Sequence, residues 1–184
     1  MNMKKRIISI MFLGIIIIGG YFIILNFNEF VIENEPTKIE EGLNKFINRP
    51  EGNLKVKLLK IQQIDKTDTF VAIFSINESD FGYAKLEKKF FNKLKIIYTS
   101  SGSAKIAYKD IETNKGNYGL LFGLNPQFVI HTVQINNLEG THTQKVDVSN
   151  KEVILVADKL SKEVEKAITS KLLFFDKEGN EVVE

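Results

Sequence analysis

Few residues of this 184-residue chain could carry out catalysis. The chain has two histidines, His131 and His142, and no cysteine, so thiolate catalysis, disulfide bonds and Cys-ligated metal sites are excluded. His131 lies in FVIHTVQI and His142 in GTHTQ, and their separation matches no recognised spacing of metal ligands. We therefore predict no catalytic residue, no metal site and no cofactor, and the sequence favours a non-enzymatic protein.

The segments DKEGN and GNYGLLFG resemble ligand-binding loops only in part. Asp176, Glu178 and Asn180 alternate like calcium ligands, but an EF-hand loop needs glycine at its sixth position, whereas Gly179 would stand at the fourth. GNYGLLFG, residues 116–123, lacks the P-loop pattern, and a strand pattern follows it instead of a helix. We predict a hairpin turn at the first segment and tight strand packing or a bulge at the second.

Positive charge and aromatic side chains occur together in YAKLEKKFFNKLK, residues 83–95. Lysine interleaved with phenylalanine suits binding to an anionic envelope polymer or to lipid headgroups. The alternative interpretation is a β-hairpin with a lysine-rich solvent face, whose phenylalanines belong to the core or to a sheet edge. The candidate ligand-binding residues are Lys85, Lys88, Lys89, Phe90, Phe91, Lys93 and Lys95.

Strands are predicted to position these residues, because apolar residues alternate with polar ones from Leu54 onward. Breaks rich in turn residues, DKTD at 65–68, NESD at 77–80 and SSGS at 100–103, separate the first strands. The apolar residues predicted to share a face within each strand are Leu54, Val56 and Leu58, then Phe70, Ala72, Phe74 and Ile76, then Leu94, Ile96 and Tyr98.

The strand pattern continues to the C-terminal hairpin KLLFFDKEGNEVV, in which Gly179 supplies a positive φ. One short amphipathic helix is predicted after Pro36, and residues 159–171 are ambiguous between a short helix, which we favour, and a strand. Eight or nine short strands without strand–helix alternation predict a mainly β chain with an antiparallel, sandwich-like domain. An α+β half-barrel is the alternative.

Residues 7–27 form an apolar run of 21 residues with the length of a membrane-spanning helix. A helix of that length spans about 31 Å, close to the thickness of the hydrocarbon core of a bilayer. No A-x-A-like cleavage pattern follows the run, so we predict a retained signal anchor in contact with the lipid bilayer. The alternative is a cleaved signal peptide with an atypical site.

The charges beside the apolar run predict its orientation. Lys4, Lys5 and Arg6 precede it, which places the N-terminus in the cytoplasm and the rest of the chain outside the cell membrane. The predicted organisation is a cytoplasmic tip and anchor over residues 1–30, a stalk with the short helix over residues 31–50, and an extracytoplasmic β domain over residues 51–184. The net charge is only +2, so nucleic acid is not an expected partner.

With the anchor, the segments FGYAKLEKKFFNKLKIIY, TNKGNYGLLFGLNP and FFDKEGNEV make the chain resemble small single-pass envelope proteins of Gram-positive, Bacillus-like bacteria. The resemblance implies a setting in the cell envelope. It brings no catalytic or binding residues with it.

The function predicted from the sequence is a membrane-anchored, non-catalytic binding or structural module of the bacterial cell envelope. One alternative is an accessory subunit of a membrane protein complex, with a membrane protein as its partner. The other is an extracytoplasmic enzyme that depends on a metal or on carboxylates, using His131 or the acids Glu87, Asp110 and Glu112.

Overall fold

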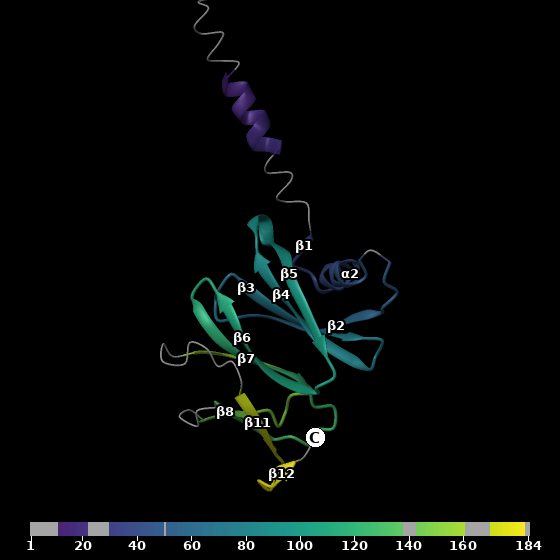
Figure 1. Ribbon diagram of the computed structural model, residues 1–184, viewed down its shortest axis with the longest axis vertical. Helices are drawn as coiled ribbons and strands as arrows, with labels where there is room; N and C mark the ends of the chain where they lie inside the picture. Colours follow the sequence, from purple (N-terminus) through teal and green to yellow (C-terminus); the bar gives the residue numbers. More distant parts are fainter. Residues whose placement is uncertain (1–10, 22–29, 50, 138–142, 161–169, 183–184) are drawn as a thin grey trace, which may run out of the picture.

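A computed structural model describes residues 11–21, 30–49, 51–137, 143–160 and 170–182 (Figure 1). Residues 11–21 form a helix, and the remaining described residues form twelve strands, helix α2 and a short 3-10 turn, η1. No helix within these ranges is both long and apolar enough to cross a bilayer. Residues 7–10 and 22–27 of the predicted span lie outside them.

The strands form three sheets in which all pairs are antiparallel, so the prediction of a mainly β, antiparallel chain is confirmed. Sheet A contains, in spatial order, β1 (Val31–Glu33), β5 (Lys93–Gly102), β4 (Asp80–Lys88), β3 (Thr69–Ile76) and β2 (Val56–Gln63). Sheet B contains β10 (Val153–Lys159), β7 (Gly116–Leu124) and β6 (Ile106–Thr113). Sheet C contains β12 (Glu181–Val182), β11 (Ser170–Phe175), β8 (Thr132–Asn137) and β9 (Thr143–Asp147).

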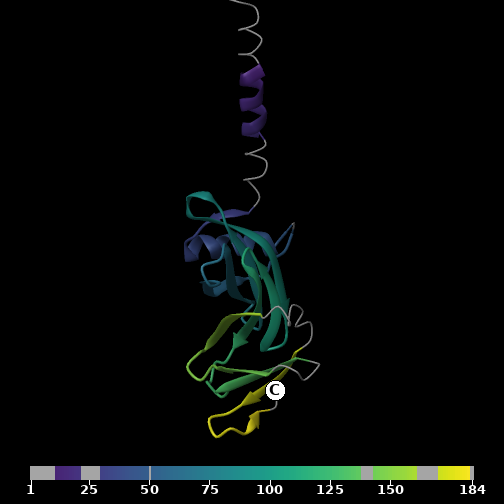
Figure 2. The same ribbon diagram turned by 90° about the vertical axis from the view of Figure 1, so that its left-hand side faces the viewer.

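Three apolar clusters join the sheets and α2 (Pro36–Ile47) into four layers. The first cluster lies between α2 and sheet A, and Ile39 and Leu43 of the helix are fully buried in it. The second lies between sheets A and B, and the third between sheets B and C. In both views the sheets follow one another along the long axis of the molecule, with β12 at the end far from β1 (Figures 1 and 2).

The two internal sheets explain why some strands have apolar residues at successive positions. In β3, Phe74 faces the α2 cluster while Ile73 faces the cluster shared with sheet B. In β7, Leu120 and Leu121 likewise face different clusters. A strand that is buried on both faces has no polar face, so its sequence loses the simple alternation of an exposed strand.

A β-bulge corrects the predicted face of Tyr98. Lys85 pairs with Tyr98 but Leu86 pairs with Ile96, so one extra residue of β5 interrupts the ladder. The Tyr98 ring therefore lies 5.9 Å from the ring of Tyr83, on the side of sheet B, while Ile96 faces α2. Alternation carried past a bulge assigns every later side chain to the wrong face.

Other predicted boundaries also shift. SSGS is not the break after β5, because the strand continues to Gly102. His131 lies just before β8, not within a strand. The α2 helix and the hairpin of β11 and β12 are confirmed, with Gly179 at φ +86°. Residues 161–169, most of the predicted second helix, lie outside the described residues.

Helix α2 is tied to sheet A by polar side chains as well as by apolar packing. The Nδ2 of Asn44 donates to the carbonyl of Val56 (2.8 Å), and the Oδ1 of Asn44 accepts from the backbone N–H of Val56 (3.1 Å). Glu40 accepts from the backbone N–H of Leu58 (2.8 Å). These bonds satisfy backbone groups along the outer side of β2, an edge strand of the sheet. Residues 31–47, assigned to the stalk, thus contribute a strand to sheet A and a helix to its core.

Candidate interaction site at the β4–β5 hairpin

The candidate site is the hairpin tip, which we define as residues 85–95 of β4, η1 (Phe90–Asn92) and β5. The strands close through a 2.7 Å hydrogen bond from the backbone N–H of Lys89 to the carbonyl of Lys93. Phe91 and Asn92 have left-handed backbones, with φ of 58° and 57°. Asparagine tolerates that conformation, whereas a bulky phenylalanine adopts it at a cost of roughly 1 kcal/mol or more.

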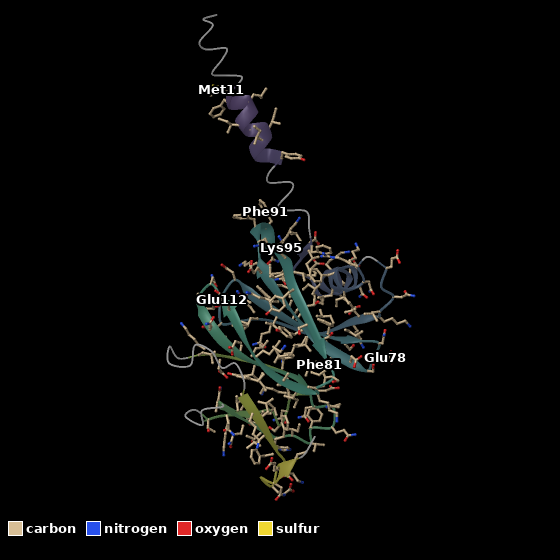
Figure 3. All side chains as sticks on the ribbon, viewed as in Figure 1. Met11, Glu78, Phe81, Phe91, Lys95 and Glu112 are labelled. Atoms are coloured by element: carbon tan, nitrogen blue, oxygen red, sulfur yellow. The ribbon has the colours of Figure 1, made fainter. Side chains whose placement is uncertain are left out.

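The two phenylalanines of the hairpin tip are turned to solvent. Phe90 is 72% exposed and Phe91 is 93% exposed, the highest value among the large apolar side chains of the described residues. The β-hairpin of the alternative interpretation is therefore confirmed, but its phenylalanines are not part of the core. Figure 3 shows Phe91 at the extremity of the sheet domain, above Lys95.

The lysines of the hairpin tip are divided between the two faces of sheet A. Register places Lys95 opposite Glu87, whereas Lys88 lies opposite Leu94, which faces α2. Lys89 forms an ion pair with Glu87 (3.1 Å), and both side chains are about one-third exposed. The lysines therefore lie on both faces of the hairpin and do not form one flat patch.

The start of the folded domain lies directly beside the hairpin tip. β1 pairs with β5, with Val31 opposite Lys95 and Glu33 opposite Lys93. The backbone N–H of Asn34 donates to the carbonyl of Asn92 (3.2 Å), which adds a contact to the tip itself. The chain that arrives from residues 22–29 therefore enters the domain next to the exposed phenylalanines.

Sequence reasoning missed a cation–π cluster at this entry point. The guanidinium carbon of Arg49 lies 3.3 Å from the ring centroid of Phe30 and 4.4 Å from that of Phe46. The two rings meet edge to face, 5.1 Å apart. An arginine between two aromatic rings contributes about 0.5–1 kcal/mol when it is exposed. The only sequence signal was an arginine one turn after Phe46, and nothing in the spacing indicated Phe30.

A depression of about 510 Å³ adjoins the hairpin tip, between β1 and α2. Its charged lining residues carry both signs, and Lys38 and Glu41 pair across one turn of α2 at 3.1 Å. The hydrogen bond from Lys38 to Glu41, followed by the charge of that carboxylate, raises the pKa of Lys38. Lys93, which belongs to the hairpin tip, gives the lining of this depression its excess of positive charge.

His131, which the enzymatic alternative would use, lies elsewhere, in a depression of about 480 Å³ at the sheet C end. This depression includes His131, Asp147 and Ser149, while His142 lies outside the described residues. Ser149 donates to Asp147 through both its backbone N–H (2.9 Å) and its hydroxyl (2.7 Å), and these bonds, the backbone one first, lower the pKa of Asp147. The serine hydroxyl thus donates to a carboxylate whose lowered pKa makes it too weak a base to activate a nucleophile. Across the described ranges, no three His, Asp or Glu residues are grouped as metal ligands.

The carboxylates of the enzymatic alternative are divided between two sheets. Glu87 belongs to sheet A, whereas Asp110 and Glu112 belong to β6 of sheet B. Burial raises the pKa of Asp110, whose Oδ1 is buried without a hydrogen-bond partner. Burial, followed by the charges of Asp110 and Asp158, raises the pKa of Tyr108 to about 12. Tyr108, Asp110 and Asp158 thus lie together on sheet B, where Asp110 and Asp158 both pair with Gly119 of β7.

Comparisons with family models, with curated proteins and with solved structures found no match to the chain.

Proposed function

We propose that the chain is a single-pass, membrane-anchored module whose sheet domain faces outward and binds an anionic component of the cell envelope. The proposed membrane anchor is supported by the apolar run at residues 7–27, which directly follows Lys4, Lys5 and Arg6. In the described helix 11–21 the large apolar side chains are 59–68% exposed, from Ile16 to Phe12. A helix that is apolar on all sides needs lipid or protein around it, which supports the anchor.

We propose binding instead of catalysis because lysines and exposed phenylalanines are concentrated at the hairpin tip. Five lysines and two highly exposed phenylalanines lie within eleven residues of chain, against one acidic residue, Glu87. Exposed aromatic rings surrounded by positive charge suit an anionic surface with an apolar component. The acids and the histidine that an enzyme would use are distributed over different sheets.

The anchor is tested with the full chain, tagged at both ends and expressed in a Gram-positive host. We expect the protein to stay in the membrane pellet after carbonate extraction. Protease added to intact protoplasts should remove the C-terminal tag and leave the N-terminal tag. A double substitution, Ile16→Lys with Ile17→Lys, should release the protein, since a lysine at the centre of a span costs about 2.5–3.5 kcal/mol.

The matched control carries Ile16→Leu and Ile17→Leu, which keep the run apolar and should leave the protein in the pellet. Mature-sized protein in the culture medium, or protection of the C-terminal tag in intact protoplasts, would reject the proposal.

A further inference from the structure

We propose that the hairpin tip is a second membrane contact, which inserts into the interface of the same bilayer that holds the anchor. Phe90 and Phe91 enter the headgroup region, and the surrounding lysines contact anionic lipid headgroups. This inference rests on the proposed function and names the partner of its binding site as the lipid surface.

Chain length places the hairpin tip at the bilayer. The predicted span ends at Phe27, and the first described residue after it is Phe30. Three residues extend at most about 10 Å, so Phe30 lies within that distance of the end of the span. The carbonyl of Phe30 accepts a hydrogen bond from the N–H of Ile96 (3.1 Å), which fixes the entry point on β5.

The hairpin tip extends beyond this entry point, at the β1 end of the sheet domain (Figure 1). Figure 3 shows Phe91 at that end of the sheet domain, while Lys95 lies further into the sheet. Figures 1 and 2 show the same end of the hairpin above β1 in two perpendicular views. A domain joined to the membrane at Phe30 therefore presents this hairpin to the membrane ahead of the other strand connections that the structure describes.

The chemistry of the hairpin tip matches a bilayer interface better than it matches water. Phe91 leaves 93% of its surface exposed, in a left-handed conformation at φ 58° that glycine or asparagine would adopt more readily. Neither packing nor backbone geometry accounts for a phenylalanine at this position. Strained positions of this kind are retained where they serve a function.

The lysines complete the match, because their long apolar stems allow the ammonium groups to remain at the headgroups while the rings sit deeper. Lys88 and Lys95 lie on opposite faces of the hairpin, so charge is available on both sides of the inserted tip. A wall polymer would need a surface along which to lie, whereas a point of insertion needs charge around its rim. This arrangement favours a lipid surface over a polymer.

The test uses the absence of tryptophan from the chain, which makes Phe91→Trp a unique fluorescent reporter. The full-length variant is reconstituted into vesicles of equal parts phosphatidylcholine and phosphatidylglycerol, with and without brominated acyl chains. We expect a blue-shifted emission that the brominated lipid more than halves. If the Phe91→Trp variant unfolds at a lower temperature than the parent protein, Phe90→Trp serves as a second reporter at the same tip.

Phe128→Trp is the matched control. Phe128 is 45% exposed and also has a positive φ, 52°, but it lies in the connection between sheets B and C. The emission of this control should not respond to brominated lipid. Replacing Lys88, Lys89, Lys93 and Lys95 with glutamine in the Phe91→Trp chain should weaken the quenching in anionic vesicles to the level seen with pure phosphatidylcholine.

The outcomes separate this inference from the anchor. If the emission of the Phe91→Trp variant is insensitive to brominated lipid, in a chain that carbonate fails to extract, the second contact is overturned and the anchor stands. Quenching is read before the carbonate step, so release of a quenched chain by carbonate rejects the anchor and with it a second contact beside the anchor, and leaves the hairpin tip as a membrane contact of its own. A response of the Phe91→Trp emission to soluble poly(glycerol phosphate) and not to brominated lipid assigns the tip to a wall polymer and overturns the inference.

Discussion

Gly82 in β4 and Gly102 in β5 lie in the two strands of the same hairpin but have different surroundings. A Cβ atom at Gly82 would lie 2.5 Å from the carbonyl oxygen of Ser100 and 2.8 Å from Cζ of Phe74. A Cβ atom at Gly102 would meet nothing within 4 Å. The first glycine therefore lets β4 and β5 approach over a core ring, while nothing in its surroundings requires the second.

Gly82→Ala is accordingly expected to lower the free energy of unfolding by about 1–3 kcal/mol, because backbone and a packed ring must both move. Gly102→Ala should stay within about 0.5 kcal/mol of the parent, as is usual for open surface positions. Urea unfolding of both full-length variants in the same detergent, followed by circular dichroism, makes the comparison. Equal destabilisation by the two alanines would contradict the close approach at Gly82.

At the scale of single elements, α2 protects β2, an edge strand of sheet A. Asn44 forms hydrogen bonds to both backbone groups of Val56 and to the carbonyl of Glu40. Unpaired edge groups are templates for pairing with another chain, so a helix that satisfies them also limits aggregation. The same helix contributes Ile39 and Leu43 to the core.

Asn44→Ala should cost about 1–3 kcal/mol, since it leaves buried backbone groups of Val56 without partners. Lys45→Ala, at the next and exposed position of the helix, is the control and should be close to neutral. Thermal unfolding measures the stability difference, and light scattering measures the aggregation that an opened edge promotes. If Asn44→Ala unfolds at the same temperature as Lys45→Ala, the hydrogen bonds to Val56 do not stabilise the docked helix.

Sequence reasoning predicted most of these elements because their local signals were strong. Pro36 marked the start of α2, and β3 was predicted with the bounds that the structure gives. The assignment of strands to sheets could not be predicted, because residues such as Leu120 and Leu121 are equally apolar yet face different sheets. For the candidate site, the lysines and phenylalanines were identified from composition. Their exposure and their position beside β1 depend on tertiary pairing that is not visible in the sequence.

At the scale of the whole molecule, the four layers are stacked in series, and sheet C packs through one apolar cluster, against sheet B. Sheet B has an apolar cluster on each face, whereas sheet C ends the stack. A terminal layer with one packed face should open at a lower free energy than the internal layers. Sheet C is also the end of the molecule far from β1 (Figure 1).

Val133→Ala, at a fully buried position of β8, should therefore lower hydrogen-exchange protection in β8, β9 and β11 while β3 and β4 keep theirs. Val129→Ala removes the same two methyl groups from a half-exposed position nearby and should change little. Mass spectrometry of peptic peptides resolves the two regions. A uniform loss of protection through sheet A would show that the stack unfolds as one cooperative unit.

The three-residue strand β1 has a mechanical consequence for the molecule. Any force transmitted through residues 22–29 reaches the domain at Phe30 and loads the pairing of Val31–Glu33 with β5 first. The stack of Arg49 on Phe30 and Phe46 reinforces this joint from the side of α2. Phe30 and Ile32 pack against the first apolar cluster, so a pull from the N-terminal side would strip this short edge strand from that cluster before it strained the clusters of sheets B and C.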